Sequence, residues 1–345
     1  MASNATDFST IVYLNFITRE FNRYIPLLCL VLGTIGNILN ILVFSRPALR
    51  TNPCSLYFIS GSLINFSSLY VGLITPFLGL YDLDPTQKSI FLCKLRFYLR
   101  YTSITLSTWF ILFACVDRYF SSCTNVNLRL CSSIHFAKRV ILLATIIAFL
   151  FPYTHVFYCY TINQRKVCTH ANSVCRLVIG TILLLCNSCI PPILMVFISI
   201  CTIRNVRIFS RISARRRRDV QLSRILFIQV ILVVICAIPI TVEKIYSCAT
   251  VMRKKSVLVA AIDSLASQIS VEISYVNSSI SFSVYSLTSK KFRKEVSRIF
   301  SSFFANQCRR TNTVQPITPK VKYNSPATID RYEHKRSRSN IIISS

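Results

Sequence analysis

Long apolar segments recur along the chain, separated by short polar or charged stretches. A helix crosses the hydrocarbon core of a bilayer, about 30 Å thick, with about 20 apolar residues. We expect seven helical spans, near residues 25–46, 54–80, 91–120, 137–160, 175–203, 222–248 and 256–287. The last is the least regular, because Asp263, Glu272 and many serines dilute it. The pattern predicts an all-α membrane protein, a seven-transmembrane helix bundle.

Composition supports a membrane protein. Of 345 residues, 52% are hydrophobic and only 15% are charged, where soluble proteins average about 25% charged. The first two dozen residues are polar and mixed in charge. We therefore expect no cleavable signal peptide, with the first span acting as the insertion signal.

The net charge of +28 is concentrated in a few segments, with +3 in residues 117–140, +7 in 204–224 and +10 from residue 289 onward. Because Lys and Arg concentrate on cytoplasmic loops, these segments predict a plasma-membrane protein with its N-terminus outside and its C-terminus inside. The run RRRR at 215–218 would indicate nucleic-acid binding in a soluble chain. Between two spans it meets anionic membrane lipids and an acidic cytoplasmic partner, so we expect no nucleic-acid partner.

The chain divides into four parts: an extracellular N-terminus (1–24), the transmembrane domain (25–288), an amphipathic helix (289–304) and a tail (305–345). In the amphipathic segment Phe292, Val296 and Ile299 recur at helical spacing while most Lys and Arg residues fall on other faces, which predicts an interfacial helix. The tail is basic, rich in Ser and Thr, and without apolar periodicity, so we expect disorder and phosphorylation sites.

The stretch LFACVDRYFSS places Asp117, Arg118 and Tyr119 at the end of the apolar third span. Because an arginine at the bilayer centre costs about 2.5–3.5 kcal/mol, we expect Arg118 at the membrane surface with Asp117 as its charge partner. A stop-transfer pair at a membrane boundary would also explain the motif. Cys93 lies 25 residues before Arg118, about 37 Å along a helix, so one helix presents a cysteine outside and Asp-Arg-Tyr inside.

Further signals follow in a fixed order: GTIGN with Asn37 in the first span, CIPP in the fifth, CAIP with Pro239 in the sixth and SFSVY with Tyr285 in the seventh. With VDRY after Cys93, this ordered set resembles the rhodopsin-like (class A) G-protein-coupled receptors over residues 25–308. The stretches QLSRILFIQVILVV and YSLTSKKFRKE are similar to invertebrate neuropeptide receptors of the FMRFamide-like kind.

The resemblance implies a receptor that binds an extracellular ligand, a neuropeptide or a small molecule, and activates a heterotrimeric G protein, with arrestin and kinases acting on the tail. It implies neither an enzyme nor a cofactor. Asp117, Arg118 and Tyr119 would form the coupling motif, in which Arg118 engages the G protein and Asp117 restrains it at rest. Pro239 would be the bend of the sixth helix, and Tyr285 would move to support Arg118.

Several positions depart from the pattern of this family. Ala237 stands where a tryptophan usually precedes the sixth-helix proline, Asn65 replaces the second-helix aspartate, and Ser281-Phe282 replaces the seventh-helix Asn-Pro. These departures leave the expected fold unchanged. They leave open whether the chain signals in the usual way, constitutively or not at all.

Buried polar residues in four spans form a second candidate constellation, and in lipid each needs a partner from its neighbours. Its members are Asn37, Asn65, Ser107, Asn277 and Ser281. We expect a neutral network between helices. The resembled family holds sodium at this place by means of a carboxylate, and because Asn65 supplies none, we expect no bound ion.

Fifteen cysteines raise the question of metal or disulfide sites. No pair of Cys-x-x-Cys motifs occurs and the four histidines are scattered, so we expect no metal site. The stretch FYCYTINQRKVCTH predicts a β-hairpin that turns at residues 163–166. The resemblance implies a disulfide between Cys93 and Cys168.

Other modifications are less determined. A second bridge among Cys159, Cys175 and Cys248 is possible, but its pairing stays open. Cys308 follows the amphipathic helix and is a candidate for palmitoylation. The sequon NAT makes Asn4 the candidate for glycosylation.

The third span also carries candidate ligand residues. Arg96, Arg100 and Ser103 recur at intervals of three or four, so they share one face, and the resemblance implies that this face lines the ligand cavity. Amine receptors have an aspartate where Arg100 stands, so an amine would meet repulsion here. Arg100 either forms an internal salt bridge with Glu272 or Glu243, or receives an acidic group of the ligand, with Arg96 assisting.

Other functions fit the sequence less well. A retinal-binding protein needs a lysine in the seventh span, and residues 256–287 contain none. Neither His-Glu-x-x-His nor Gly-x-Ser-x-Gly appears, which disfavours an intramembrane enzyme. A seven-helix transporter is the remaining alternative, with Glu243, Asp263 and Glu272 along an ion path, although broken helices and an internal repeat are missing.

Overall fold

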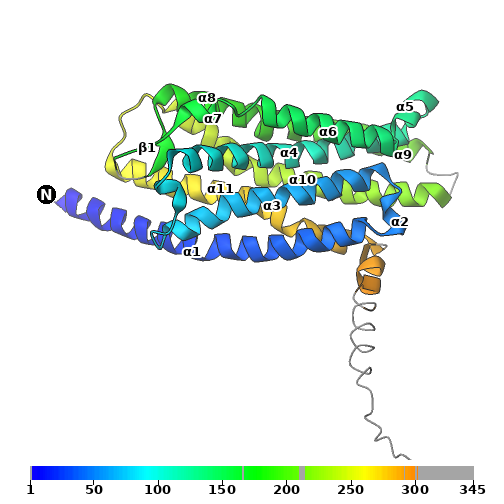
Figure 1. The fold of residues 1–345 in the computed structure, drawn as a ribbon, viewed down its shortest axis with the longest axis horizontal. Coiled ribbons are helices and arrows are strands. Elements are labelled where there is room, and N and C mark those ends of the chain that lie inside the picture. The colour runs from blue at the N-terminus through cyan, green and yellow to red at the C-terminus, as the bar shows by residue number, and fades with distance from the viewer. Residues whose placement is uncertain (1, 165–166, 210–213, 291, 300, 302–345) are drawn as a thin grey trace, which may run out of the picture. The chain divides into compact units, whose positions relative to one another are not determined.

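The computed structural model describes residues 2–164, 167–209, 214–290, 292–299 and 301. Long helices lie side by side in one bundle (Figure 1). In chain order, the crossing segments are α1 (Ala2–Phe44), α3 (Pro53–Gly79), α4 (Ile90–Ser122), α6 (Ile134–Leu150), α8 (Ser173–Leu183) continued by η2 (Leu184–Cys189) and α9 (Ile190–Phe209), α10 (Ala214–Ala249) and α11 (Val257–Thr288).

Short elements lie between the crossing helices. They are α2 (Pro47–Arg50), η1 (Pro85–Gln87), α5 (Val126–Cys131), α7 (Val156–Cys159), β1 (Tyr160–Ile162) and β2 (Cys168–His170). β1 and β2 pair antiparallel, with Tyr160 opposite His170, which confirms the predicted hairpin. We call the end of the bundle with β1 and β2 the hairpin end, and the end with α2 and α5 the Asp-Arg-Tyr end (Figure 1).

Among the described residues, six helices are long and apolar enough to cross a membrane. The seventh, α6, has 17 residues, at the short limit for a span. The predicted fourth span ran to residue 160, but α6 ends at Leu150. The reason is Pro152, which disfavours helical backbone at the residue before it and has no N–H to donate.

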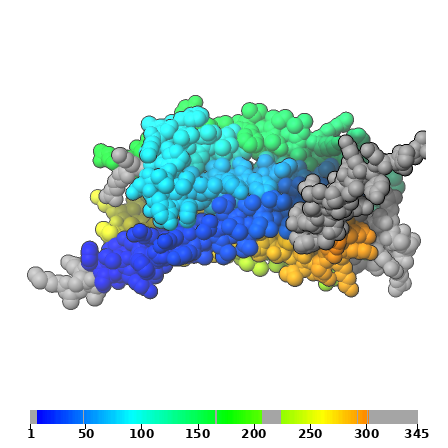
Figure 2. All heavy atoms as spheres, turned by 60° about the horizontal axis from the view of Figure 1, so that its bottom comes forward, coloured from blue at the N-terminus to red at the C-terminus, as the bar shows by residue number. Residues whose placement is uncertain are grey.

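The first helix also differs from the prediction, because α1 begins at Ala2 and not near residue 25. Its 43 residues measure about 64 Å at 1.5 Å per residue, about twice the hydrocarbon thickness. The N-terminal turns of α1 project beyond the neighbouring helices (Figures 1 and 2). The backbone of Asn4 lies in α1, whereas its side chain is outside the described part of the protein.

The surface and the interior have the reverse polarity of a soluble protein. Large apolar side chains face outward, for example Leu142 and Ile193, which are 63% and 67% exposed. Asn37 and Asn40 are fully buried. Lipid requires this arrangement, because polar groups can find hydrogen-bond partners only inside the bundle.

The crossing formed by α8 and α9 contains a π-helical turn, Leu184–Cys189, which the sequence interpretation did not anticipate. Pro191 and Pro192 follow one residue later, after Ile190. A proline has no N–H and its ring collides with the carbonyl four residues earlier, so it disturbs the regular hydrogen-bond ladder. The wider turn frees the carbonyl of Cys186 to accept a bond from Trp109 Nε1 at 2.8 Å.

The amphipathic helix is described over residues 292–299. Ser289 caps it by accepting from the Phe292 N–H at 3.1 Å. Phe292, Val296 and Ile299 pack against the main core, so the predicted apolar face contacts the bundle itself. Cys308 and the predicted disordered tail lie outside the described residues.

Candidate functional site

The Asp-Arg-Tyr end is built around a buried ion pair near the end of α4. Arg118 Nη2 lies 2.6 Å from Asp117 Oδ2 and 2.8 Å from Asn52 Oδ1, and Ser132 donates to Asp117 Oδ1 at 2.7 Å. Arg118 and Asp117 are only 2% and 5% exposed. Arg118 thus lies near the end of α4 with Asp117 as its partner, and these side chains satisfy its charge inside the protein.

Tyr119 and Tyr285 occupy different surroundings. Tyr119 is half-buried and lies beside Phe120. Tyr285 is buried, and its ring centroid lies 5.0 Å from that of Phe58 and 6.0 Å from that of Phe292. Tyr285 thus joins the seventh crossing to the second and to the amphipathic helix.

The predicted polar network is divided into separate parts. Asn65 Nδ2 donates to Asn37 Oδ1 at 3.1 Å and Ser107 Oγ donates to Asn65 Oδ1 at 2.6 Å, which links α1, α3 and α4. The other two predicted members bond elsewhere, because nearer partners exist that the sequence interpretation missed. Ser281 accepts from Asn40 at 3.1 Å, and Asn277 accepts from Gln229 at 2.7 Å.

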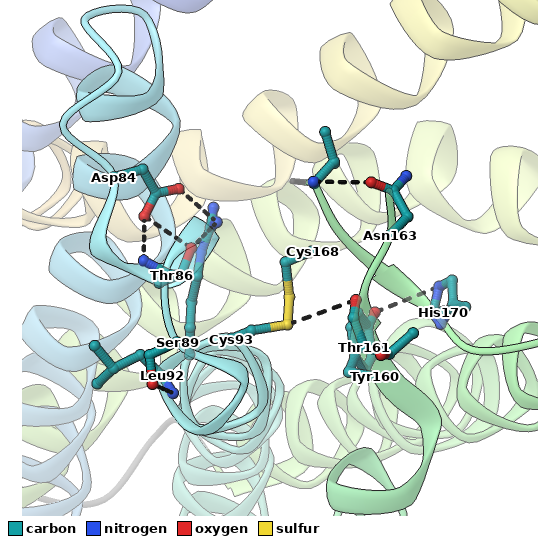
Figure 3. Close-up of a disulfide and its surroundings, with 12 residues drawn as sticks. Asp84, Thr86, Ser89, Leu92, Cys93, Tyr160, Thr161, Asn163, Cys168 and His170 are labelled. Carbon is teal, nitrogen blue, oxygen red and sulfur yellow. Dashed lines mark hydrogen bonds and ion pairs between the residues drawn. A yellow bond between two sulfur atoms is a disulfide. The ribbon is translucent and has the colours of Figure 1, made fainter. Parts of the chain in front are cut away.

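Two disulfides fix the hairpin end. Cys93 at the start of α4 is joined to Cys168 on β2, with 5.8 Å between their Cα atoms (Figure 3). Cys159 is joined to Cys175 on α8, whereas Cys248 is free. The open question of the second bridge is thus resolved in the structure, and the hairpin is tied to both α4 and α8.

Arg96 has an internal partner, Asp84. Its Nη1 lies 3.6 Å from Asp84 Oδ2, and its guanidinium lies 5.2 Å from the ring centroid of Phe97. Asp84 precedes the short turn η1 and accepts from the Thr86 N–H (Figure 3). In this conformation η1 places a carboxylate beside Arg96, and its assistance to a ligand stays a prediction.

Arg100 lies deeper, with its guanidinium 5.7 Å from the Tyr275 ring centroid. Among the described residues, Arg100 Nε, Glu272 Oε2 and the Tyr275 hydroxyl are buried without a hydrogen-bond partner, and no ion pair within 4.0 Å joins Arg100 to Glu272 or Glu243. Glu243 instead pairs with Lys244 at 2.9 Å. The predicted salt bridge of Arg100 with Glu272 or Glu243 is therefore not formed among the described residues.

Two cavities open at the hairpin end. One of about 700 Å³ lies between α8, α10 and α11 and includes Pro239 and Asp263 in its lining. Another of about 540 Å³ lies between the hairpin, α4, α8 and α10. Glu243 lines both, whereas Arg96, Arg100, Ser103 and Glu272 line neither. Ser103 is buried and donates to Ser67 Oγ.

Among the residues of the smaller cavity that the sequence interpretation missed are His170, Arg176 and Lys244. Burial, with the nearby charges of Arg176 and Lys244, lowers the pKa of His170 to about 4. Its Nε2 lies 3.3 Å from the Tyr160 hydroxyl. The only signal for these residues in the sequence is that they are ionisable and lie beside apolar spans. That signal does not show which helix ends meet in the fold. Over the described residues, no three His, Cys, Asp or Glu side chains are grouped as metal ligands.

Comparison with known proteins supplies the family. The profile of the 7 transmembrane receptor (rhodopsin family) matches residues 36–281, a range that runs from the GTIGN motif to the seventh crossing. No curated protein sequence matches the chain. The chain therefore belongs to the rhodopsin family of seven-transmembrane receptors, which are multi-pass proteins of the plasma membrane.

Proposed function

We propose that the protein binds an extracellular ligand at the hairpin end and activates a heterotrimeric G protein at the Asp-Arg-Tyr end. The buried pair of Arg118 and Asp117 is the observation that carries this proposal. Three segments hold the pair: the end of α4, the start of α3 through Asn52, and the turn after α5 through Ser132. A charge pair buried at a helix end can exchange its partners when helices shift. Such a pair can therefore help a receptor to switch between two conformations.

The orientation follows from charge. α9 ends and α10 begins at the Asp-Arg-Tyr end (Figure 1), so the segment 204–224, with a net charge of +7, belongs to that end. Lys and Arg concentrate on the cytoplasmic side of membrane proteins. This assignment places the hairpin, both disulfides and the two cavities outside the cell, where disulfides persist.

The cavities have the size of ligand sites, and Arg176 in the lining of both would repel an amine. Each falls within the range of about 300–1,000 Å³ typical of ligand sites, and both open beside one another along α10. We propose a peptide, a neuropeptide in the physiological setting. The FMRFamide-like resemblance rests on two short stretches alone, because no curated relative supports it.

The transporter alternative is less well supported. Glu243 pairs with Lys244, and Asp263 pairs with Lys255 at 2.5 Å. Two of the three acids are thus neutralised by neighbours, and among the described residues only Glu272 is left unpaired, which does not suit a continuous path of titrating acids.

A screen of peptide libraries in cells that express a promiscuous G protein tests the function. Once an agonist is found, Arg118→Ala should abolish agonist-evoked nucleotide exchange while surface expression persists. Arg129→Ala, which removes an exposed arginine of α5, is the matched control and should keep the response. Full signalling by Arg118→Ala would overturn the proposed mechanism.

A further inference from the structure

We infer that the smaller cavity at the hairpin end is a binding site for a carboxylate, whose cationic partners are Arg176 on α8 and Lys244 on α10. This inference rests on the proposed function, because it assigns the chemistry by which the extracellular ligand is recognised. It moves recognition away from Arg100, which does not line the cavity.

The first step is the balance of charge. Arg176 and Lys244 are the cations of the lining and Glu243 is its acid. Because Glu243 pairs with Lys244 at 2.9 Å, one net positive charge remains, and it resides on Arg176. Arg176 donates to Ser247 Oγ at 3.0 Å, and no carboxylate among the described residues lies within 4.0 Å of it.

The second step is the charge of the ligand. One net positive charge is matched by a monoanion, whereas a doubly charged phosphate would leave an excess negative charge in a partly buried site. The guanidinium of arginine offers two parallel N–H groups to the two oxygens of a carboxylate. The cavity of about 540 Å³ also has room for the atoms that carry the carboxylate.

The third step is His170, which serves as a built-in reporter. It lines the same cavity as Arg176 and Lys244, and the other titratable groups nearby are Tyr160 on β1, Tyr101 on α4, and Glu243 and Cys248 on α10. Both cations oppose its protonation. A bound carboxylate would offset them and raise the pKa of His170 above about 4.

This linkage fixes the direction of a pH effect. Because binding favours the protonated imidazole, carboxylate affinity should rise as pH falls from 7.5 to 5.5, a range in which an ordinary carboxylate stays ionised. His170→Gln removes the titrating group and should flatten this dependence.

The test uses the full chain in uncharged lipid discs, with histidine labelled for NMR. Acetate is titrated against chloride at constant ionic strength, and the His170 signal is identified by its loss in His170→Gln. We expect acetate to shift this signal and raise its pKa, and Arg176→Gln to weaken acetate binding at least about tenfold, as loss of a charge-assisted pair implies. Arg253→Gln, outside the lining of both cavities, should leave binding unchanged.

A second arm distinguishes the source of the carboxylate. Trialanine with a free C-terminus is compared with its amide and with acetate. Tighter binding of the free peptide assigns the site to a peptide carboxylate, and equal binding of acetate assigns it to a small acid. No acetate effect on His170, or equal effects in wild type and Arg176→Gln, would overturn the inference. G-protein activation is not measured here, so failure of the proposed function would be recognised separately.

Discussion

Asp117→Asn tests whether the buried ion pair stabilises the resting receptor. The substitution keeps the size of the side chain but removes the charge that Arg118 Nη2 and Nε approach at 2.6 and 3.2 Å. Loss of one partner of a buried pair costs about 3–5 kcal/mol. We expect the lower end of that range, because Arg118 keeps Asn52 as an acceptor at 2.8 Å.

The cost falls on whichever conformation contains the pair. If that is the resting state, about 3 kcal/mol shifts the ratio of active to resting receptor roughly a hundredfold, since each 1.4 kcal/mol is tenfold. Ligand-free nucleotide exchange, measured with purified receptor and G protein, should rise accordingly. The melting temperature of the receptor should fall at the same time.

Two further variants sharpen this experiment. Ser132→Ala removes one hydrogen bond to Asp117, worth about 1 kcal/mol, and should raise basal exchange about fivefold. Asp82→Asn is the control, because Asp82 is exposed and its positive φ of 56° is a conformation that asparagine tolerates. Wild-type basal exchange in both Asp117→Asn and Ser132→Ala would refute the restraint.

Three other predictions concern stability and ions. Gly72→Ala places a methyl group against the hydroxyl and ring of the buried Tyr275 and should cost about 1–3 kcal/mol; Tyr275→Phe, which removes that hydroxyl, should recover part of the loss of melting temperature, and additive losses would contradict the contact. Between pH 6.5 and 4 the unfolded chain protonates His170 before the folded protein does, so acidification should destabilise the fold by up to about 3 kcal/mol; an equal pH slope in His170→Gln would contradict this. Sodium, compared with potassium, should not change the stability of the Asn65 cluster, because no carboxylate is present, and a sodium-selective rise in melting temperature would show otherwise.

The number and order of crossing helices followed from hydropathy, because lipid leaves few alternatives to long apolar helices. Their ends were harder to predict. The effect of Pro152 is local and was visible in the sequence. The early start of α1 was not visible, because a polar segment can be helical without any apolar signal. The π turn before Pro191 depends on how the backbone accommodates two prolines.

The candidate site was less predictable, because it depends on which helices meet. Helical spacing correctly placed Arg96 and Arg100 on one helix, but it could not reveal that Asp84, from a different segment, pairs with Arg96. The Asn65 cluster shows the same limit, since two of its expected members found other partners. Periodicity identifies a face, whereas the partner of that face is set by tertiary packing.

The covalent links at the hairpin end indicate which helix responds to a ligand. The bridges of Cys93 and Cys159 tie α4 and α8 to the hairpin, whereas Cys248 at the end of α10 is free. Lys244 and Pro239 place α10 along both cavities. If the proposed carboxylate ligand bridges Arg176 and Lys244, we expect it to pull a non-covalently held helix toward a fixed one. Because Pro239 interrupts the hydrogen-bond ladder of α10, we expect the displacement to bend this helix there, and so to reach the Asp-Arg-Tyr end through α10 and not through α4.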